Sequence, residues 1–240
     1  MPDKRTHRGA HPEDAELFSA GHVDNLRQAV ADYSLLLSKG YAPKSSLKLV
    51  GDRFSLTDRQ RLAVRRCGCA DGQLEVRRAN EVAISSLAGE SIVIDGYNVL
   101  ITTEAALSGA PIFRSRDSCF RDLAGIHGTY RKLTETVPAI EIVARCLEEI
   151  GVSNVLWLFD SPVSNSGRLK TIIGSLAGEN GWPWEIELLP NPDVKLIETD
   201  MTAATSDSDV LDKCGKWTNL TAHLITNAVS EAKIIDLSTV

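Results

Sequence analysis

The stretch Ser91-Ile-Val-Ile-Asp-Gly-Tyr-Asn-Val-Leu100 decides the fold that we predict for this chain. Its β-branched run, Ile92 to Ile94, is typical of a short strand buried on both faces. Asp95, Gly96 and Asn98 follow almost at once. Ligands of open α/β sheets bind just beyond the carboxyl ends of the strands, so an acid beside a flexible glycine is well placed to hold a metal ion or a phosphate. A simple Asx-type turn is the alternative, because Asp-Gly and Asn form such turns routinely.

Strands and helices alternate after this stretch, which is typical of parallel βαβ units in an α/β fold. A loop at 108–111 follows the first strand. We expect further strands at 155–159, 182–189, 223–226 and 234–237, and helices at 116–133, 137–150 and 169–176, with one more beginning near residue 207.

The N-terminal third is predicted to be a separate small unit. Residues 1–20 are polar and predict a flexible arm, and residues 21–88 predict a mainly helical, basic domain. One of its helices opens with a capping box, Thr57 to Gln60. Between residues 44 and 78, nine basic residues stand against four acidic ones. This excess predicts a surface that contacts phosphates, although a solvated helix face is the alternative. The arginines concerned are Arg59, Arg61, Arg65 and Arg66.

Length and composition limit the class of protein. With 240 residues, 43% hydrophobic and 24% charged, the chain suits one full-sized α/β domain plus a smaller unit. The net charge of −6 argues against a surface coated in basic residues. Five cysteines without metal-site spacing favour reduced thiols in the cytoplasm. We find no signal peptide and no membrane-spanning run, so we expect a soluble protein with no membrane contact.

A second predicted strand also ends in an acid, Asp160. The carboxyl ends of parallel strands lie along one edge of the sheet, so Asp95 and Asp160 are expected to converge. A third group opens the predicted helix near residue 207. Helical spacing places Asp207 on its apolar face, which favours this residue as a ligand. Asp209 is the second choice, because Ser206 and Asp209 also match a capping pattern.

The predicted helix 116–133 carries two further acids. Asp122 lies at the border of the inward face and is therefore a candidate for the site. Asp117 points away from that face and is expected to pair at the surface with Arg121, four residues along.

Carboxylates that converge repel one another unless a cation neutralises them or some are protonated. Oxygen ligands of this kind select Mg²⁺ or Mn²⁺. Hydrolysis of a phosphodiester is the chemistry that such a cluster serves best. The sequence contains no Walker A motif, no dinucleotide fingerprint and no G-x-S-x-G elbow.

Three motifs of this chain resemble those of NYN domains, which are PIN-like nucleases. They are Ile94-Asp-Gly-Tyr-Asn-Val-Leu100, Leu158-Phe-Asp160-Ser and Ala204-Thr-Ser-Asp207-Ser-Asp209-Val. The resemblance covers roughly residues 91–237. It implies a Rossmann-like three-layer α/β/α domain, assigned to residues 89–240, that cleaves RNA with Mg²⁺ or Mn²⁺. It also implies that Asp95 is a metal ligand supported by Asn98. The whole chain resembles a prokaryotic family that pairs a small N-terminal domain of unknown function with a PIN-like domain.

One departure concerns the segment His223-Leu-Ile-Thr226-Asn227, where the family often places an acid after the strand. The amide of Asn227 would ligate a cation more weakly, so two hypotheses stay open. The first is a metal-dependent endoribonuclease, and the second is a catalytically silent RNA-binding or scaffold module on the same fold. A phosphatase with Asp95 as nucleophile ranks last, because position 97 is Tyr. Either leading hypothesis implies RNA as partner, and a homodimer is left open.

The first hypothesis assigns a role to each candidate residue. The catalytic residues are Asp95, Asp160, Asp207 and Asp122; the metal ligands are Asp95, Asp160, Asp207 and Asp209; the supporting residues are Asn98, Asn227 and Asp117; the RNA contacts are Arg121, Arg59, Arg61, Arg65 and Arg66.

Overall fold

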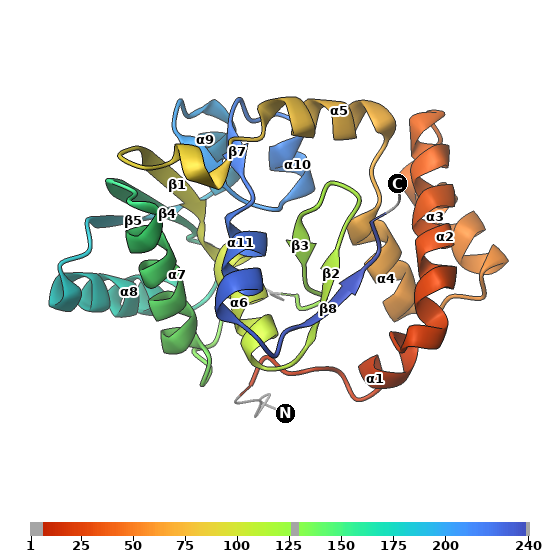
Figure 1. The fold of residues 1–240 in the computed structure, drawn as a ribbon, viewed down its shortest axis with the longest axis horizontal. Coiled ribbons are helices and arrows are strands. Elements are labelled where there is room, and N and C mark those ends of the chain that lie inside the picture. Colours follow the sequence, from red (N-terminus) through yellow and green to blue (C-terminus); the bar gives the residue numbers. More distant parts are fainter. Residues whose placement is uncertain (1–6, 126–129, 239–240) are drawn as a thin grey trace.

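A five-stranded parallel sheet forms the centre of the protein in a computed structural model, which describes residues 7–125 and 130–238 (Figure 1). Its strand order is β5-β4-β1-β6-β7, and every neighbouring pair is parallel. Strand β1, which contains Ile92 to Ile94 and ends at Asp95, lies in the middle. The predicted α/β class with a parallel sheet is thereby confirmed. The strands are β1 (Ser91–Asp95), β4 (Asn154–Asp160), β5 (Trp184–Leu189), β6 (Thr202–Ala204) and β7 (Trp217–Thr218).

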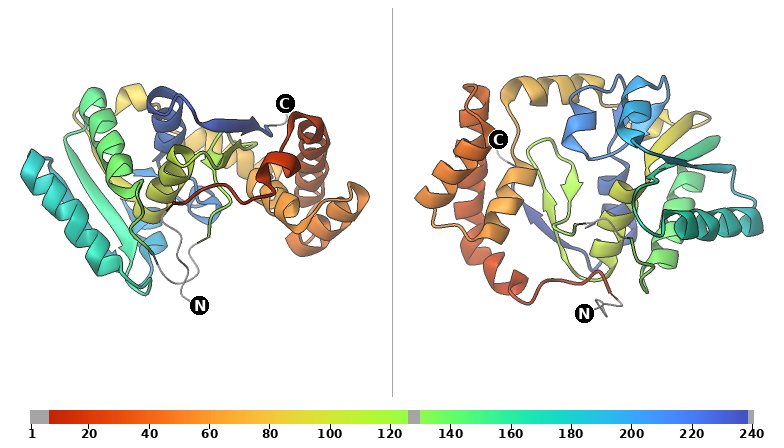
Figure 2. Two further views of the ribbon diagram at one scale, coloured as in Figure 1. Left: turned by 90° about the horizontal axis from the view of Figure 1, so that it is seen from below. Right: turned by 180° about the vertical axis from the view of Figure 1, so that it is seen from behind.

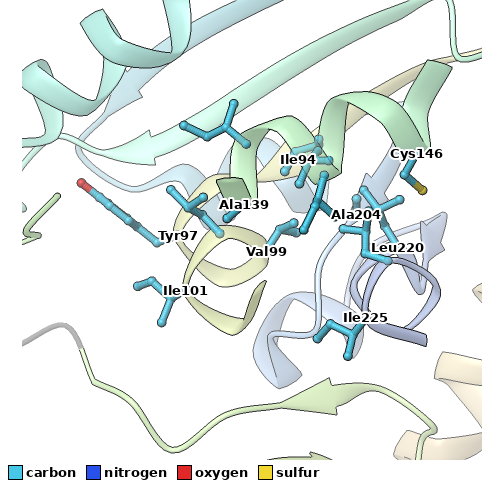
Figure 3. Packing of buried hydrophobic residues seen from close by; sticks show 14 of the residues in the cluster. Ile94, Tyr97, Val99, Ile101, Ala139, Cys146, Ala204, Leu220 and Ile225 are labelled. Carbon is cyan, nitrogen blue, oxygen red and sulfur yellow. The ribbon is translucent and has the colours of Figure 1, made fainter. Parts of the chain in front are cut away.

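Helices cover both faces of this sheet. On one face, Ile94 and Ala204 pack with residues of four helices, and Figure 3 shows part of this cluster. On the other face, Val93 and Ala203 pack with two shorter helices. The first group comprises α6 (Gly96–Leu107), α7 (Thr136–Ile150), α8 (Ser166–Asn180) and α11 (Leu220–Ala228), and the second comprises α9 (Pro192–Glu198) and α10 (Ser208–Leu211).

The prediction of a helix over 116–133 is wrong. Within this segment lies β3 (Phe120–Arg121), a strand of a second, smaller sheet. That sheet has the order β3-β2-β8 and also contains β2 (Pro111–Arg114) and β8 (Lys233–Asp236). Ser118 adopts a φ of 65° in the connection between β2 and β3, which a helix would not allow. Residues 126–129 of the predicted helix lie outside the described residues.

Two other elements differ from prediction. Residues 223–226, predicted as a strand, belong to helix α11. A short apolar run is compatible with either a strand or a buried helix, so its pattern alone did not discriminate. The segment between Asp95 and the predicted loop at 108–111, for which no element was predicted, forms helix α6, and a turn at 108–109 follows it.

The N-terminal part is helical, as predicted. Thr57 and Gln60 form the predicted capping box, since each side chain accepts a hydrogen bond from the other residue's backbone N–H. The helices are α1 (Asp14–Leu17), α2 (Ala20–Ser38), α3 (Pro43–Arg53), α4 (Asp58–Cys67) and α5 (Asp71–Asn80), and a 3₁₀ turn, η1 (Ile84–Ser86), leads into β1. None of the helices within 7–125 and 130–238 is both long and apolar enough to cross a membrane.

These N-terminal helices share a hydrophobic core with the smaller sheet. Leu26 and Val64, from α2 and α4, belong to one buried cluster with Phe113 of β2 and Leu237 just after β8. The ring of Phe18 meets that of Phe113 edge to face, with centroids 4.8 Å apart. The boundary predicted near residue 88 therefore marks a change of architecture, but the core continues across it.

The expectation of a loose arm over residues 1–20 needs correction for its described part. Residues 14–17 are helical, and α2 already begins at Ala20. The segment from His7 runs from α1 toward α6 (Figure 2, left), where Arg8 pairs with Glu104 at 2.6 Å. Asp14 pairs with Arg59. These ion pairs fix the segment against the rest of the protein, and its polar composition alone did not predict them.

Candidate metal centre

Asp95 and Asp207 meet through a shared hydroxyl at the carboxyl edge of the sheet. Asp95 ends β1, and its carboxylate accepts a hydrogen bond from the backbone N–H of Asn98 at 3.4 Å. Thr205 follows β6, and its Oγ1 donates to Asp95 Oδ2 at 2.8 Å. The same Oγ1 accepts from the backbone N–H of Asp207 at 3.0 Å. Neighbouring parallel strands thus bring together two acids that lie 112 residues apart in the sequence.

Asn98, in the first turn of α6, links the Asp95 carboxylate to the loop that carries Asp207. Its side-chain oxygen accepts from the backbone N–H of Ser206 at 2.8 Å and from Ser206 Oγ at 2.9 Å. Asn98 therefore lies where a supporting residue was expected, between the carboxylate of the first strand and the loop of the third acid.

Asp207 caps helix α10. Its Oδ1 accepts from the backbone N–H groups of Asp209 and Val210, at 2.8 and 3.2 Å. The capping role considered for Asp209 therefore belongs to Asp207, and Asp209 is exposed. Asp207 does not lie on a long apolar helix face as predicted, because α10 ends at Leu211 and the helix does not continue beyond it.

Electrostatics couple a larger group of carboxylates. Burial raises the pKa of Asp95 to about 7; the hydrogen bond from Thr205 offsets part of this rise, and the negative charge of Asp207 adds to it. Asp160, at the end of β4, has its pKa raised by burial. The pKa of Asp193 is raised by burial and then by the charges of Asp207 and Asp160. Neighbouring negative charges thus add to the raised pKa values of Asp95 and Asp193, the situation that a bound cation would relieve.

Asp193 was missed at the sequence level, because residues 194–197 were not assigned to a helix. A usable signal was present in Asn191-Pro192, since Asn is a favoured N-cap residue and Pro is favoured in the first turn. Asn191 does cap α9, accepting from the backbone N–H of Asp193 at 3.2 Å.

The donor set suits an open metal site and does not suit a closed cage. Among the residues that the structure describes, no three His, Cys, Asp or Glu side chains gather closely enough to enclose a metal ion. Mg²⁺ is commonly bound through one or two carboxylates and keeps several waters. Asp95 and Asp207 are the two carboxylates that could hold such an ion directly, and Asp160 and Asp193 could contact it through its waters.

Asp122 lies elsewhere and is already engaged. It is buried, and it accepts from Thr102 Oγ1 at 2.7 Å and from the backbone N–H of Ala124 at 2.6 Å. Thr102 is seven residues beyond Asp95 on α6, about 10 Å along the helix. Because the segment of Asp122 is not helical, the face assigned to this residue does not exist, and its carboxylate serves the local structure.

The predicted pair of Asp117 and Arg121 is present, but it is buried. Their side chains are 1% and 7% exposed and lie 2.8 Å apart, and Arg77 adds a second guanidinium at 2.5 Å. Burial opposes ionisation, yet the two guanidiniums hold the pKa of Asp117 below its usual range. Arg121 is therefore not available to an RNA phosphate, and the predicted surface position of Asp117 is wrong.

The basic helix α4 is less free than its sequence suggested. Arg61 pairs with Asp52 at 2.8 Å, and the guanidinium of Arg66 donates to the carbonyl of Ala124 at 3.1 Å. With Arg59 held by Asp14, the remaining arginine of this helix, Arg65, is exposed. Most of the predicted phosphate surface is thus used within the protein.

Asn227 does not lie at the sheet edge. It is exposed near the end of α11, where its Nδ2 donates to the carbonyl of His223 at 2.8 Å. The amide that does follow the outer strand β7 is Asn219, whose Nδ2 donates to the carbonyl of Ser118 at 3.0 Å. The expected role for Asn227 failed because residues 223–226 are helical.

Comparison with known proteins gives two family matches. Residues 25–80 match a protein of unknown function, DUF434, and residues 84–223 match a domain of unknown function, DUF5616. The uncharacterized protein MJ0935 of Methanocaldococcus jannaschii is 27% identical over 187 residues, which cover 78% of this chain and 89% of that protein. No solved structure matches. The match to DUF5616 covers more than half of this chain, so the chain belongs to the DUF5616 family.

Proposed function

We propose that this protein is a Mg²⁺- or Mn²⁺-dependent hydrolase of RNA phosphodiester bonds. The observation that carries the proposal is that Thr205 joins the Asp95 carboxylate to the backbone N–H of Asp207, at the edge of the sheet where ligands of such folds bind. Burial raises the pKa of Asp95 and so disfavours its ionised form, and a bound cation would stabilise that form. A divalent ion there supplies an activated water and neutralises charge on the phosphoryl oxygens. The three NYN-like motifs support RNA as the substrate.

The chain's own residues divide the remaining work. Asp95 and Asp207 would hold the ion, and Thr205 fixes the orientation of the Asp95 carboxylate by donating to it. Asn98 fixes the loop of Asp207 to the start of α6, beside Asp95. Asp160 and Asp193 would accept hydrogen bonds from waters at the site, and they keep it selective for a cation.

Exposed cations border the loop after Asp160. Two hydrogen bonds join this loop to residue 130: the backbone N–H of Tyr130 donates to the carbonyl of Ser164 at 3.0 Å, and Asn165 Nδ2 donates to the carbonyl of Tyr130 at 2.9 Å. In the described ranges, no ion pair involves the four exposed basic side chains here. These cations, rather than those of α4, suit phosphate contacts beside the site. They are Arg131, Lys132, Arg168 and Lys170.

A catalytically silent RNA-binding module is the second candidate. The specific observation in its favour is that no three potential ligands enclose a metal position within the described residues. This candidate predicts RNA binding that falls with salt but does not depend on a divalent ion. A reducing, cytoplasmic setting suits either candidate, since the five cysteines are free and buried.

Cleavage of end-labelled single-stranded RNA by the purified protein, with Mn²⁺ or with EDTA, tests the proposal. We expect cleavage that requires the metal and falls at least 100-fold in Asp95→Asn and in Asp207→Asn. Asp200→Asn is the matched control, because Asp200 is exposed and precedes β6 at the opposite edge of the sheet. Metal-independent binding without cleavage would favour the silent module. Cleavage unchanged in Asp95→Asn would refute the assigned site.

A further inference from the structure

Two buried arginines hold the loop that carries Asp207. Arg121 Nε donates to the carbonyl of Ser206 at 2.9 Å. Arg77 Nη2 donates to the carbonyl of Ser208 at 3.3 Å. The residues directly before and after Asp207 are therefore each tied to a guanidinium.

The same loop is held from the opposite side. Asn98 accepts the backbone N–H of Ser206, while Arg121 takes up the carbonyl of the same residue. Thr205 accepts the N–H of Asp207. The backbone leading into the carboxylate is thus fixed between α6 and the arginine pair.

The arginine pair is itself locked by acids. Asp117 accepts from Arg77 Nη1 at 2.5 Å and from Arg121 Nη2 at 2.8 Å, and Asp212 accepts from Arg77 Nε at 2.7 Å. Arg77 has only 2% of its side chain exposed. Two carboxylates balance the two guanidiniums, so the group is close to neutral. It therefore acts on Asp207 mainly by fixing the position of the loop, and less through its net charge. Charge-assisted hydrogen bonds in a buried setting define that geometry closely.

We infer that Arg77 is a positioning residue for the candidate metal centre and that the N-terminal helical region completes the centre. Arg77 belongs to α5, within residues 25–80, whereas Asp207 lies within residues 84–223. The inference rests on the proposed function for its consequence, which is metal affinity. It gives a physical reason why the two matched regions occur in one chain: the first holds the ligand loop of the second.

The full chain and its variants test this inference through two readouts. Mn²⁺ affinity is measured by electron paramagnetic resonance of the free ion, and hydrogen exchange is followed at the amides of Asp209 and Val210, which donate to Asp207. For Arg77→Gln we expect a 10- to 100-fold weaker Mn²⁺ affinity, the loss typical of residues that orient ligands. We also expect exchange at least tenfold faster at both amides.

Arg77→Lys should recover only part of the affinity, because one ammonium cannot span Asp117, Asp212 and the carbonyl of Ser208 together. Arg116→Gln is the matched control. Arg116 also joins the two regions, through Asp71 at 2.6 Å and the carbonyl of Cys69 at 2.7 Å, but it does not touch the loop. Both readouts should match wild type in this variant.

Asp212→Asn is the milder variant if Arg77→Gln does not fold. Asp212 is 18% exposed, and its loss leaves the pair of Arg77 with Asp117 intact. We expect a smaller change in the same direction. Wild-type affinity and wild-type exchange in a folded Arg77→Gln or Asp212→Asn protein would overturn the inference. Faster exchange in a protein whose wild type binds no Mn²⁺ would instead support the positioning and refute the proposed function.

Discussion

Removing the guanidinium of Arg8 should destabilise the protein by about 3 kcal/mol, because it leaves a buried carboxylate without its cation. Glu104 is fully buried on α6, and Arg8 donates to its Oε2 through Nε at 3.1 Å and Nη2 at 2.6 Å. Tyr130 and Thr136 donate to Oε1 at 2.5 and 2.6 Å. Breaking a buried pair costs roughly 3–5 kcal/mol, and the two remaining hydroxyl donors place this case at the lower end.

Urea and thermal unfolding of Arg8→Ala measure the effect. A loss of about 3 kcal/mol corresponds to roughly 6–12 °C in Tm for a chain of this length. In a Glu104→Gln background, the same substitution should cost less than about 1 kcal/mol, because no buried charge is left unpaired. Arg53→Ala is the control; its guanidinium pairs with Asp32 at the surface, and the cost should stay below about 1 kcal/mol.

The reasoning would be refuted if Arg8→Ala unfolded within about 0.5 kcal/mol of wild type, the scatter of ordinary surface substitutions. An equal cost in the presence and absence of the Glu104 carboxylate would refute it too. Either result would mean that water, and not the N-terminal segment, satisfies this carboxylate.

Three further predictions concern the site, the packing and the thiols. In metal-free buffer, the free energy of unfolding of wild type should fall relative to that of Asp95→Asn as pH rises from about 4 to 7. Burial and the charge of Asp207 raise the pKa of Asp95 to about 7 in the folded state. Between these pH values the folded state therefore holds a proton that the unfolded state has released. Urea titrations at pH 5 and pH 8 measure this, and an equal difference at both would contradict it. Gly96→Ala places a Cβ against the buried ring of Phe159 and should lower stability by about 1–3 kcal/mol, whereas Gly167→Ala meets open space and should not. Thermal unfolding compares the two variants. The five buried thiols should react with a disulfide reagent at least 10-fold more slowly in the native protein than in urea, and equal rates would mean that they are accessible.

The features that could be predicted from the sequence are those with local causes. The β-branched run before Asp95 identified the central strand, and the apolar run before Asp160 identified its neighbour. The helix predicted at 137–150 corresponds to α7, which Gly151 ends with a φ of 82°. Alternating strands and helices predict a parallel sheet, and acids that end parallel strands lie along one edge, so their convergence could also be predicted.

The failures share a different cause, namely partners that are distant in the sequence. Arg59, counted as a free cation, pairs with Asp14, and Asp117 pairs with Arg77 across 40 residues. Charge spacing along a helix contains no information on such partners.

Strand β6, which carries the loop of Asp207, was missed for another reason. It has only Thr202-Ala-Ala204, and three small residues give no hydrophobic signal.

The core that the N-terminal helices share with the smaller sheet has a consequence for synthesis on the ribosome. Leu237 is buried among residues of α2 and α4, and Arg27 Nε donates to the carbonyl of Asp236 at 2.9 Å. Helices α2 to α4 leave the ribosome before the rest of their core, because part of that core is supplied by β8 and the residue after it. Their packing therefore stays incomplete until more than 150 further residues have been translated, so the region made first is among the last to reach its final structure.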